Sequence, residues 1–171
     1  MPDALGFALK HAPQGIALIN SAIFLDSLRY KLSDHPKTQE IFGRLDGWAG
    51  SAGLPGLFGH TGIFSQYVIG SAELVASVLL LTGAFYAPYR FLLPIGALLG
   101  LAIMTGAVSF HLFTPLGVDP NNDGGGLFVA ACINLAAAIL MLTVFRRREF
   151  AALLQRVAAV FAPLKPTAVR S

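Results

Sequence analysis

The chain has 171 residues, of which 55% are hydrophobic and only 12% charged. Soluble domains carry about 25% charged residues. This shortage, with a mean hydropathy of +0.67, excludes a disordered chain, a disulfide-stapled secreted module and a typical soluble enzyme. The net charge is +3, but the basic residues form no stripe interleaved with aromatic residues, so nucleic acid is not a predicted partner. The composition predicts an all-α polytopic membrane protein in contact with the lipid bilayer.

Crossing a bilayer takes about 20 residues. The sequence predicts four segments that are apolar and long enough to do so. They lie near residues 13–32, 64–86, 91–113 and 125–145. The last three are almost continuously apolar. The first ends in a polar stretch containing Asp26, Arg29 and Lys31, which must face the bundle interior or the membrane interface. These spans predict a four-helix membrane domain over residues 1–148.

The distribution of Lys and Arg predicts the orientation of the spans. With a cytoplasmic N-terminus, eight of the 12 basic residues fall on the cytoplasmic side. They are Lys10, Arg90, Arg146, Arg147, Arg148, Arg156, Lys165 and Arg170. The connection 114–124 contains acidic residues and no basic one, which is typical of an outer loop. Both termini are therefore predicted to be cytoplasmic.

Two amphipathic helices are expected outside the spans. In the long first outer loop, apolar residues at helical spacing predict a helix lying in the outer interface, with Trp48 as its anchor. These residues are Ile41, Phe42, Leu45 and Trp48. Beyond Arg148, the apolar positions again have helical spacing, so residues 149–171 are predicted to form an amphipathic cytoplasmic tail. These positions are Phe150, Leu153, Leu154, Val157 and Phe161.

Glu73 stands near the middle of the second span, where an ionised carboxylate costs about 2.5–3.5 kcal/mol on insertion scales. It therefore needs a partner, a proton or a cavity. Alternating span directions bring Asp26, Arg29 and Lys31 to the same end of the bundle. The sequence predicts that Glu73 pairs with Arg29 or Lys31, either to lock the bundle or to handle a ligand or proton. Asp26 and Arg29, three residues apart, could equally satisfy each other.

Two further polar residues inside spans are candidate site residues. His111, near the outer end of the third span, could ligate haem or copper, bond a quinone carbonyl or donate a hydrogen bond. A haem held by two histidines would require His60 from the first outer loop, so haem is not the predicted cofactor. Asn134 is typical of an interhelical hydrogen-bonding residue. The single Cys132 excludes a dithiol mechanism within this chain.

The segment 119–124 matches the opening D-x-N-x-D-G of a calcium loop. The twelfth position is Ala130, where such a loop requires a bidentate Glu. We therefore predict no metal site and interpret Asp123 as the N-cap of the fourth helix. Recognised hydrolase and phosphate-binding motifs do not occur, so no catalytic residue is identified.

The second span contains Gly70-Ser71-Ala72-Glu73-Leu74 followed by Leu79-Leu80-Leu81-Thr82-Gly83, with Arg90 before the third span. This pattern resembles the DoxX family of small four-helix bacterial membrane proteins, over roughly residues 15–145. Gly53-Leu54-Pro55 and His111 are also similar, and Lys31 looks like the basic residue with which the family ends its first helix. The resemblance implies location in the bacterial inner membrane.

The resemblance also implies a role. The family is named after a membrane subunit of a thiosulfate:quinone oxidoreductase, and other members are linked to membrane-associated redox complexes. One hypothesis is therefore a redox-linked subunit that binds quinone in the outer half of the bundle. Its site would be bounded by Asp26, Arg29, Glu73, His111 and Asn134, with Glu73 and His111 handling protons and Arg29 or Lys31 holding the carboxylate. The alternative is a non-catalytic accessory subunit that packs against other subunits of a larger membrane complex.

Overall fold

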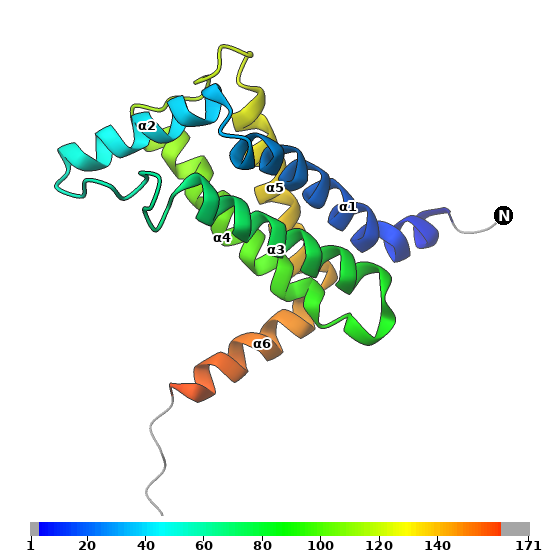
Figure 1. Ribbon diagram of the computed structural model, residues 1–171. Helices are drawn as coiled ribbons and strands as arrows, with labels where there is room; N and C mark the ends of the chain where they lie inside the picture. Colours follow the sequence, from blue (N-terminus) through cyan, green and yellow to red (C-terminus); the bar gives the residue numbers. More distant parts are fainter. Residues whose placement is uncertain (1–3, 162–171) are drawn as a thin grey trace, which may run out of the picture.

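A computed structural model describes residues 4–161, and every regular element in that part of the chain is a helix (Figure 1). In chain order the elements are α1 (Ala4–Leu32), α2 (Pro36–Ser51), α3 (Gln66–Phe85), a 3₁₀ turn (Ala87–Tyr89), α4 (Leu92–Phe113), α5 (Gly126–Leu140), a π-helical turn (Met141–Phe145) and α6 (Arg147–Val160). The all-α prediction is confirmed for the described residues.

Local sequence explains where several helices begin and end. The Ser65 side chain caps α3 by accepting a hydrogen bond from the backbone N–H of Val68. Pro36 begins α2, where its missing N–H costs little. The helix α1 is longer than the predicted span, because it continues through Pro13 back to Ala4.

The helices α1, α3, α4 and α5 form one bundle in which successive helices run in alternating directions (Figure 1). The helix α1 packs chiefly on α3, α3 on α4, and α4 on α5, while α5 returns to contact α1. Large buried side chains fill the centre; they include Phe24, Leu80, Leu93, Met141 and Leu142. We name the two ends of the bundle after the helices beside them, the α2 end and the α6 end.

Glycines allow α3 and α4 to approach closely. A Cβ atom on Gly83 would lie 2.4 Å from the backbone nitrogen of Leu93, and one on Gly96 would lie 2.9 Å from the backbone nitrogen of Leu80. Both separations are shorter than van der Waals contact. Small residues at such crossings are typical of helices packed within membranes.

A second, smaller apolar cluster covers the α2 end of the bundle. It is built from Leu45 and Ala49 of α2, Phe58 of the loop that follows, and Leu116 after α4. Trp48 of α2 packs edge-on against Phe110 of α4, with ring centroids 6.5 Å apart. The helix α2 thus occupies the first long loop, and its apolar face rests on the rest of that loop and on the end of α4.

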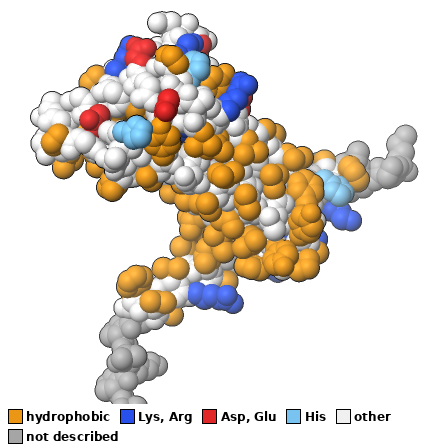
Figure 2. Space-filling model, in the orientation of Figure 1, with side chains coloured by type: hydrophobic (Ala, Val, Ile, Leu, Met, Phe, Trp, Pro, Cys, Tyr) orange, Lys and Arg blue, Asp and Glu red, His pale blue; other side chains and the backbone are white. Residues whose placement is uncertain are grey.

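Within residues 4–161, three helical segments are long and apolar enough to cross a membrane. They are Gln66–Phe85, Leu92–Phe113 and Gly126–Phe145. The surface of the bundle seen in Figure 2 is largely hydrophobic, and charged side chains gather over α2 and its neighbouring loops. The chain is therefore a membrane protein. The 29-residue α1 is not among the three, because Lys10, Asp26, Arg29 and Lys31 lower its hydropathy.

The helix α6 leaves the α6 end and projects away from the bundle (Figure 1). None of its residues is buried. Its apolar residues include Leu154 and Val157, each 49% exposed. The described part of the predicted tail, residues 149–171, is thus largely occupied by α6, and residues 162–171 lie outside the described residues.

Candidate functional site

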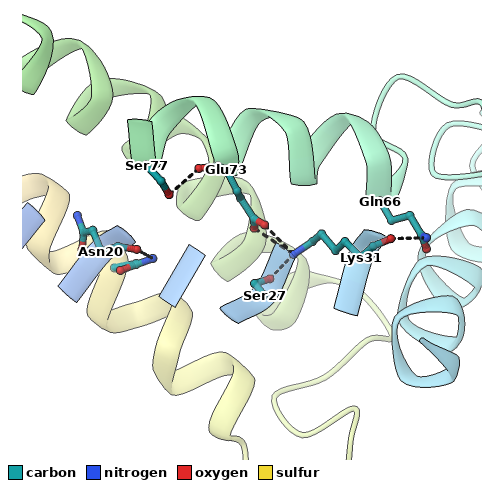
Figure 3. A network of polar contacts seen from close by, with 7 residues as sticks. Asn20, Ser27, Lys31, Gln66, Glu73 and Ser77 are labelled. Carbon is teal, nitrogen blue, oxygen red and sulfur yellow. Dashed lines mark hydrogen bonds and ion pairs between the residues drawn. The ribbon is translucent and has the colours of Figure 1, made fainter. Parts of the chain in front are cut away.

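The charged pair predicted for Glu73 is formed with Lys31. The Nζ atom of Lys31 donates to both carboxylate oxygens of Glu73, at 3.0 Å each. Only 12% of the Lys31 side chain and 3% of the Glu73 side chain are exposed. Figure 3 shows the pair between the last turn of α1 and the second turn of α3. Two opposite charges are therefore buried together near the α2 end.

Neighbouring residues hold this pair in place. The Oγ atom of Ser27, one turn before Lys31, accepts a further hydrogen bond from Lys31 Nζ. The Oγ atom of Ser77 donates to the backbone carbonyl of Glu73 at 2.8 Å. Gly70 lets the lysine stem pass, because a Cβ atom there would lie 3.4 Å from Lys31 Cδ and 3.1 Å from Leu28 Cδ1.

A polar cluster that the sequence analysis did not single out continues from the pair to the α2 end. The Nε2 atom of Gln66 donates to the Lys31 carbonyl at 2.8 Å and to Asp34 Oδ1 at 2.6 Å. The same Asp34 oxygen accepts from Tyr67 Oη and from Gln39 Nε2. Gln39 Nε2 also donates to Gln66 Oε1. The signal in the sequence was a Gln at the very start of an apolar span.

Asp26 and Arg29 do not belong to this site. They form an ion pair of 2.9 Å with each other, three residues apart, and their side chains are 62% and 66% exposed. The guanidinium of Arg29 also stacks on the ring of Tyr30, 4.6 Å from its centroid. Of the two partners predicted for Glu73, Arg29 is the wrong one, because its side chain leaves α1 on a different face from that of Lys31.

His111 is buried and anchors the loop after its own helix. Its Nδ1 atom lies 2.6 Å from the carbonyl oxygen of Gly117. A carbonyl only accepts, so Nδ1 carries the proton. The ring packs edge-on against Phe128 of α5, with centroids 5.5 Å apart. His60 instead contacts Tyr67. Among the described residues, no group of three His, Cys, Asp or Glu side chains is placed to hold a metal ion.

Asn134 acts between helices as predicted. Its Nδ2 atom donates to the backbone carbonyl of Asn20 at 3.4 Å, and both asparagines are 1% exposed. This contact joins α5 to α1 nearer the middle of the bundle. The five residues expected to bound one site are therefore distributed over separate places, and only Glu73 forms the buried charged pair.

The carboxylates of the calcium-like segment 119–124 accept hydrogen bonds from nearby backbone N–H groups. Asp119 accepts hydrogen bonds from the N–H groups of Asp123, at 2.9 Å, and Gly124, at 3.3 Å. These bonds, that of Asp123 first, hold the pKa of Asp119 below its ordinary value of 3.8. The prediction that Asp123 is the N-cap of α5 is wrong, because Gly125 occupies that position, with φ 81°. Asp123 still accepts from the N–H of Gly126 at 2.9 Å.

Two cavities lie beside α2 and the loop after it. One, of about 140 Å³, is lined by residues that include Gln39, Phe42, Asp46, Phe58, His60 and Gln66. The other, of about 330 Å³, is shallow and lies along residues 54–63. Through Gln66, the first cavity is one hydrogen bond away from the backbone of Lys31.

Comparison of the chain with protein-family models, with curated proteins and with solved structures finds no match.

Proposed function

We propose that the chain is a DoxX-like protein of the bacterial inner membrane with four spans. These spans are α1 and the three segments that are long and apolar enough to cross a membrane. Two observations support this placement. The helix α1 packs along α3 within the bundle, and its most buried charged side chain, Lys31, is neutralised by Glu73. The excess of basic residues at the α6 end favours that end as the cytoplasmic side, with α2 on the outer side.

Within that frame, we infer a redox-linked subunit in which the Lys31–Glu73 pair handles protons for a quinone bound in the outer half. The buried ion pair carries this inference. Ionisable residues among membrane spans are expensive and tend to mark functional sites. The cavity lined by Gln39 and Gln66 supports it further, since Gln66 joins it by a hydrogen bond to the backbone of Lys31.

Quinone analysis of purified protein tests this function. The wild-type protein is expected to retain quinone above the level carried by co-purified lipid, and Glu73→Gln is expected to lose it. Asp26→Asn is the matched control, because it removes a carboxylate from an exposed pair on the same bundle. Quinone at the lipid level in the wild-type protein would remove the basis of the redox role.

A non-catalytic accessory subunit is the second candidate, favoured by how completely the polar residues are satisfied. Lys31 has three hydrogen-bond acceptors within the bundle, and His111 is occupied by its own loop. Under this function Glu73→Gln weakens the bundle and leaves quinone content unchanged. Co-purification of other membrane subunits with the wild-type chain would then be the expected result.

A further inference from the structure

The helix α6 carries an apolar face that no other part of the described chain covers. None of its residues is buried. Leu154 and Val157 are each 49% exposed, Val160 is 80% exposed, and Phe161 at the C-cap is 82% exposed. Large apolar side chains exposed together in this way indicate a surface that a partner covers.

This apolar face is turned toward the side of α6 on which the bundle lies. Phe150, in the first turn of α6, packs against the core of the bundle. Val157 follows seven residues later and therefore points within about 20° of Phe150. Leu154 follows four residues after Phe150 and points about 40° from it. The face that begins against the bundle thus continues along α6 on the bundle side.

The chain changes direction between α5 and α6. The third membrane-crossing segment ends at Phe145, and Arg146 after it has φ −127° and ψ 27°, which are not helical values. In Figure 1, α6 accordingly runs crosswise to α5 instead of continuing its line. A helix that turns crosswise where a membrane-crossing segment ends is placed to lie along the membrane surface, here with its apolar side toward the bilayer.

The segment that contains α6 is strongly basic. Residues 146–160 include four arginines and one glutamate, a net charge of 4 − 1 = +3. Arg146 pairs with Glu149 at 3.1 Å, whereas Arg147, Arg148 and Arg156 form no ion pair among the described residues. The helix α2, at the other end of the bundle, has two basic and two acidic residues and no net charge. Selection of an acidic partner is therefore expected at α6 and not at α2.

Two of the arginines border the apolar face. At 100° per residue, Arg147 and Arg156 lie about 80° and about 100° from Val157, one on each side of it. Arginines at such positions cover apolar surface with their stems and extend their guanidinium groups to the level of lipid headgroups. Arg148 instead points about 180° from Val157, away from the apolar face.

We propose that α6 lies in the membrane interface and binds anionic phospholipids. Leu154 and Val157 contact the acyl chains, and Arg147 and Arg156 bind the headgroup phosphates. The acidic headgroups supply the negative charge that these two arginines do not find in the described chain. This lipid site goes beyond the proposed function. It involves neither Lys31 nor Glu73, so a wild-type protein without quinone leaves it standing.

Tryptophan fluorescence with brominated phospholipids tests the proposal, because bromine on an acyl chain quenches an indole beside it. The probe is Val157→Trp in a Trp48→Phe background, which removes the single native tryptophan. The control is Gln155→Trp, which is also exposed but lies about 160° from Val157 around the helix. The full chain is reconstituted in phosphatidylcholine vesicles with about a quarter phosphatidylglycerol, and either lipid carries the bromine.

The depth of α6 is read from the two indoles. Brominated lipid is expected to quench the Val157→Trp protein and to leave the Gln155→Trp protein almost unquenched. If neither lipid quenches the Val157→Trp protein, the proposal is overturned, and a protein partner or a second copy of the chain covers α6 instead. The substituted positions on α6 are exposed, so these variants are expected to fold.

Headgroup selection is read from which lipid carries the bromine. One arginine favours an anionic lipid surface by about 1 kcal/mol, or about fivefold. A fivefold preference raises the phosphatidylglycerol share beside Val157→Trp from about a quarter to about five eighths, so quenching by its brominated form should exceed that of random mixing by about two and a half times. Quenching in proportion to the bulk composition would overturn the selection of anionic lipid.

Arginine variants of the Val157→Trp protein test the assignment of the headgroup contacts. Arg147→Gln together with Arg156→Gln is expected to return quenching by brominated phosphatidylglycerol to its random share. Arg148→Gln is the matched control, because it removes a positive charge from the opposite face, and the excess quenching should remain. An excess that survives the double variant, or that is lost in Arg148→Gln alone, would contradict binding by Arg147 and Arg156.

Discussion

The ammonium group of Lys31 is shared equally by the two carboxylate oxygens of Glu73, at 3.0 Å each, across 42 residues of sequence. This contact joins the last turn of α1 to α3 at a point where neither side chain has more than 12% exposure. It therefore fixes both the rotation of α1 about its axis and its register along α3.

Removing one partner should be far more costly than removing both. Lys31→Met leaves the Glu73 carboxylate buried and unpaired, and we expect it to destabilise the bundle by about 3–5 kcal/mol. The double variant Lys31→Met, Glu73→Met should recover most of that loss, because no charge remains buried. Unfolding in detergent micelles measures both. Asp26→Asn, which breaks the exposed pair, should cost less than about 1 kcal/mol. A double variant no more stable than Lys31→Met would show that the pair is not the source of the effect.

Close packing of α3 on α4 makes Gly83 intolerant of a side chain. Gly83→Ala places a methyl group 2.4 Å from the Leu93 backbone nitrogen, and we expect a loss of about 1–3 kcal/mol or more through overpacking. Gly106→Ala is the control on α4, where the new Cβ would meet only the Phe110 ring at 3.7 Å. Thermal unfolding of both variants tests this prediction. Similar unfolding midpoints for the two variants would argue against the close crossing of α3 and α4.

His111 is expected to order the loop between α4 and α5. His111→Phe keeps an aromatic ring but leaves the half-buried Gly117 carbonyl without its donor, a loss of about 1 kcal/mol. In limited proteolysis, this variant should then be cut within residues 114–125 faster than the wild-type protein. The control variant His60→Phe should be cut there at the wild-type rate. An unchanged cleavage rate in His111→Phe would mean that the loop is ordered without the hydrogen bond from His111.

The same loop should lose order at acid pH through Asp119. Its folded pKa lies below 3.8, because backbone N–H groups stabilise the carboxylate. The unfolded loop therefore binds a proton more readily, so the stabilisation is complete above pH 3.8 and is lost as pH falls through the lower folded pKa. The carbon NMR signal of the Asp119 carboxyl group should titrate with a midpoint below pH 3.8. The amide signal of Asp123 should change over the same pH range. A midpoint at or above 3.8 would contradict the hydrogen bonds.

Sequence patterns predicted the parts of the fold that depend on one helix at a time. Continuous apolar runs located α3, α4 and α5, and the spacing of Leu45 and Trp48 located α2. The choice between Arg29 and Lys31 remained open, because the two residues project from α1 in directions about 200° apart and the rotation of a helix depends on its neighbours.

The parts of the site that were missed depend on tertiary contacts or on backbone atoms. His111 is satisfied by the carbonyl of Gly117, an acceptor that every residue carries and no motif marks. The cluster around Asp34 and Gln66 arises because α1, α2 and α3 meet at one end.

The fourth membrane crossing by α1 is the central claim, and the sidedness of its two ends tests it most directly. In a Cys132→Ala background, His11→Cys places a thiol near the start of α1 and Thr61→Cys places one in the loop before α3; both positions are exposed. A membrane-impermeant thiol reagent applied to intact spheroplasts should label Thr61→Cys at once. It should label His11→Cys only after the membrane is opened. Labelling of both thiols from the same side would contradict the four-span account.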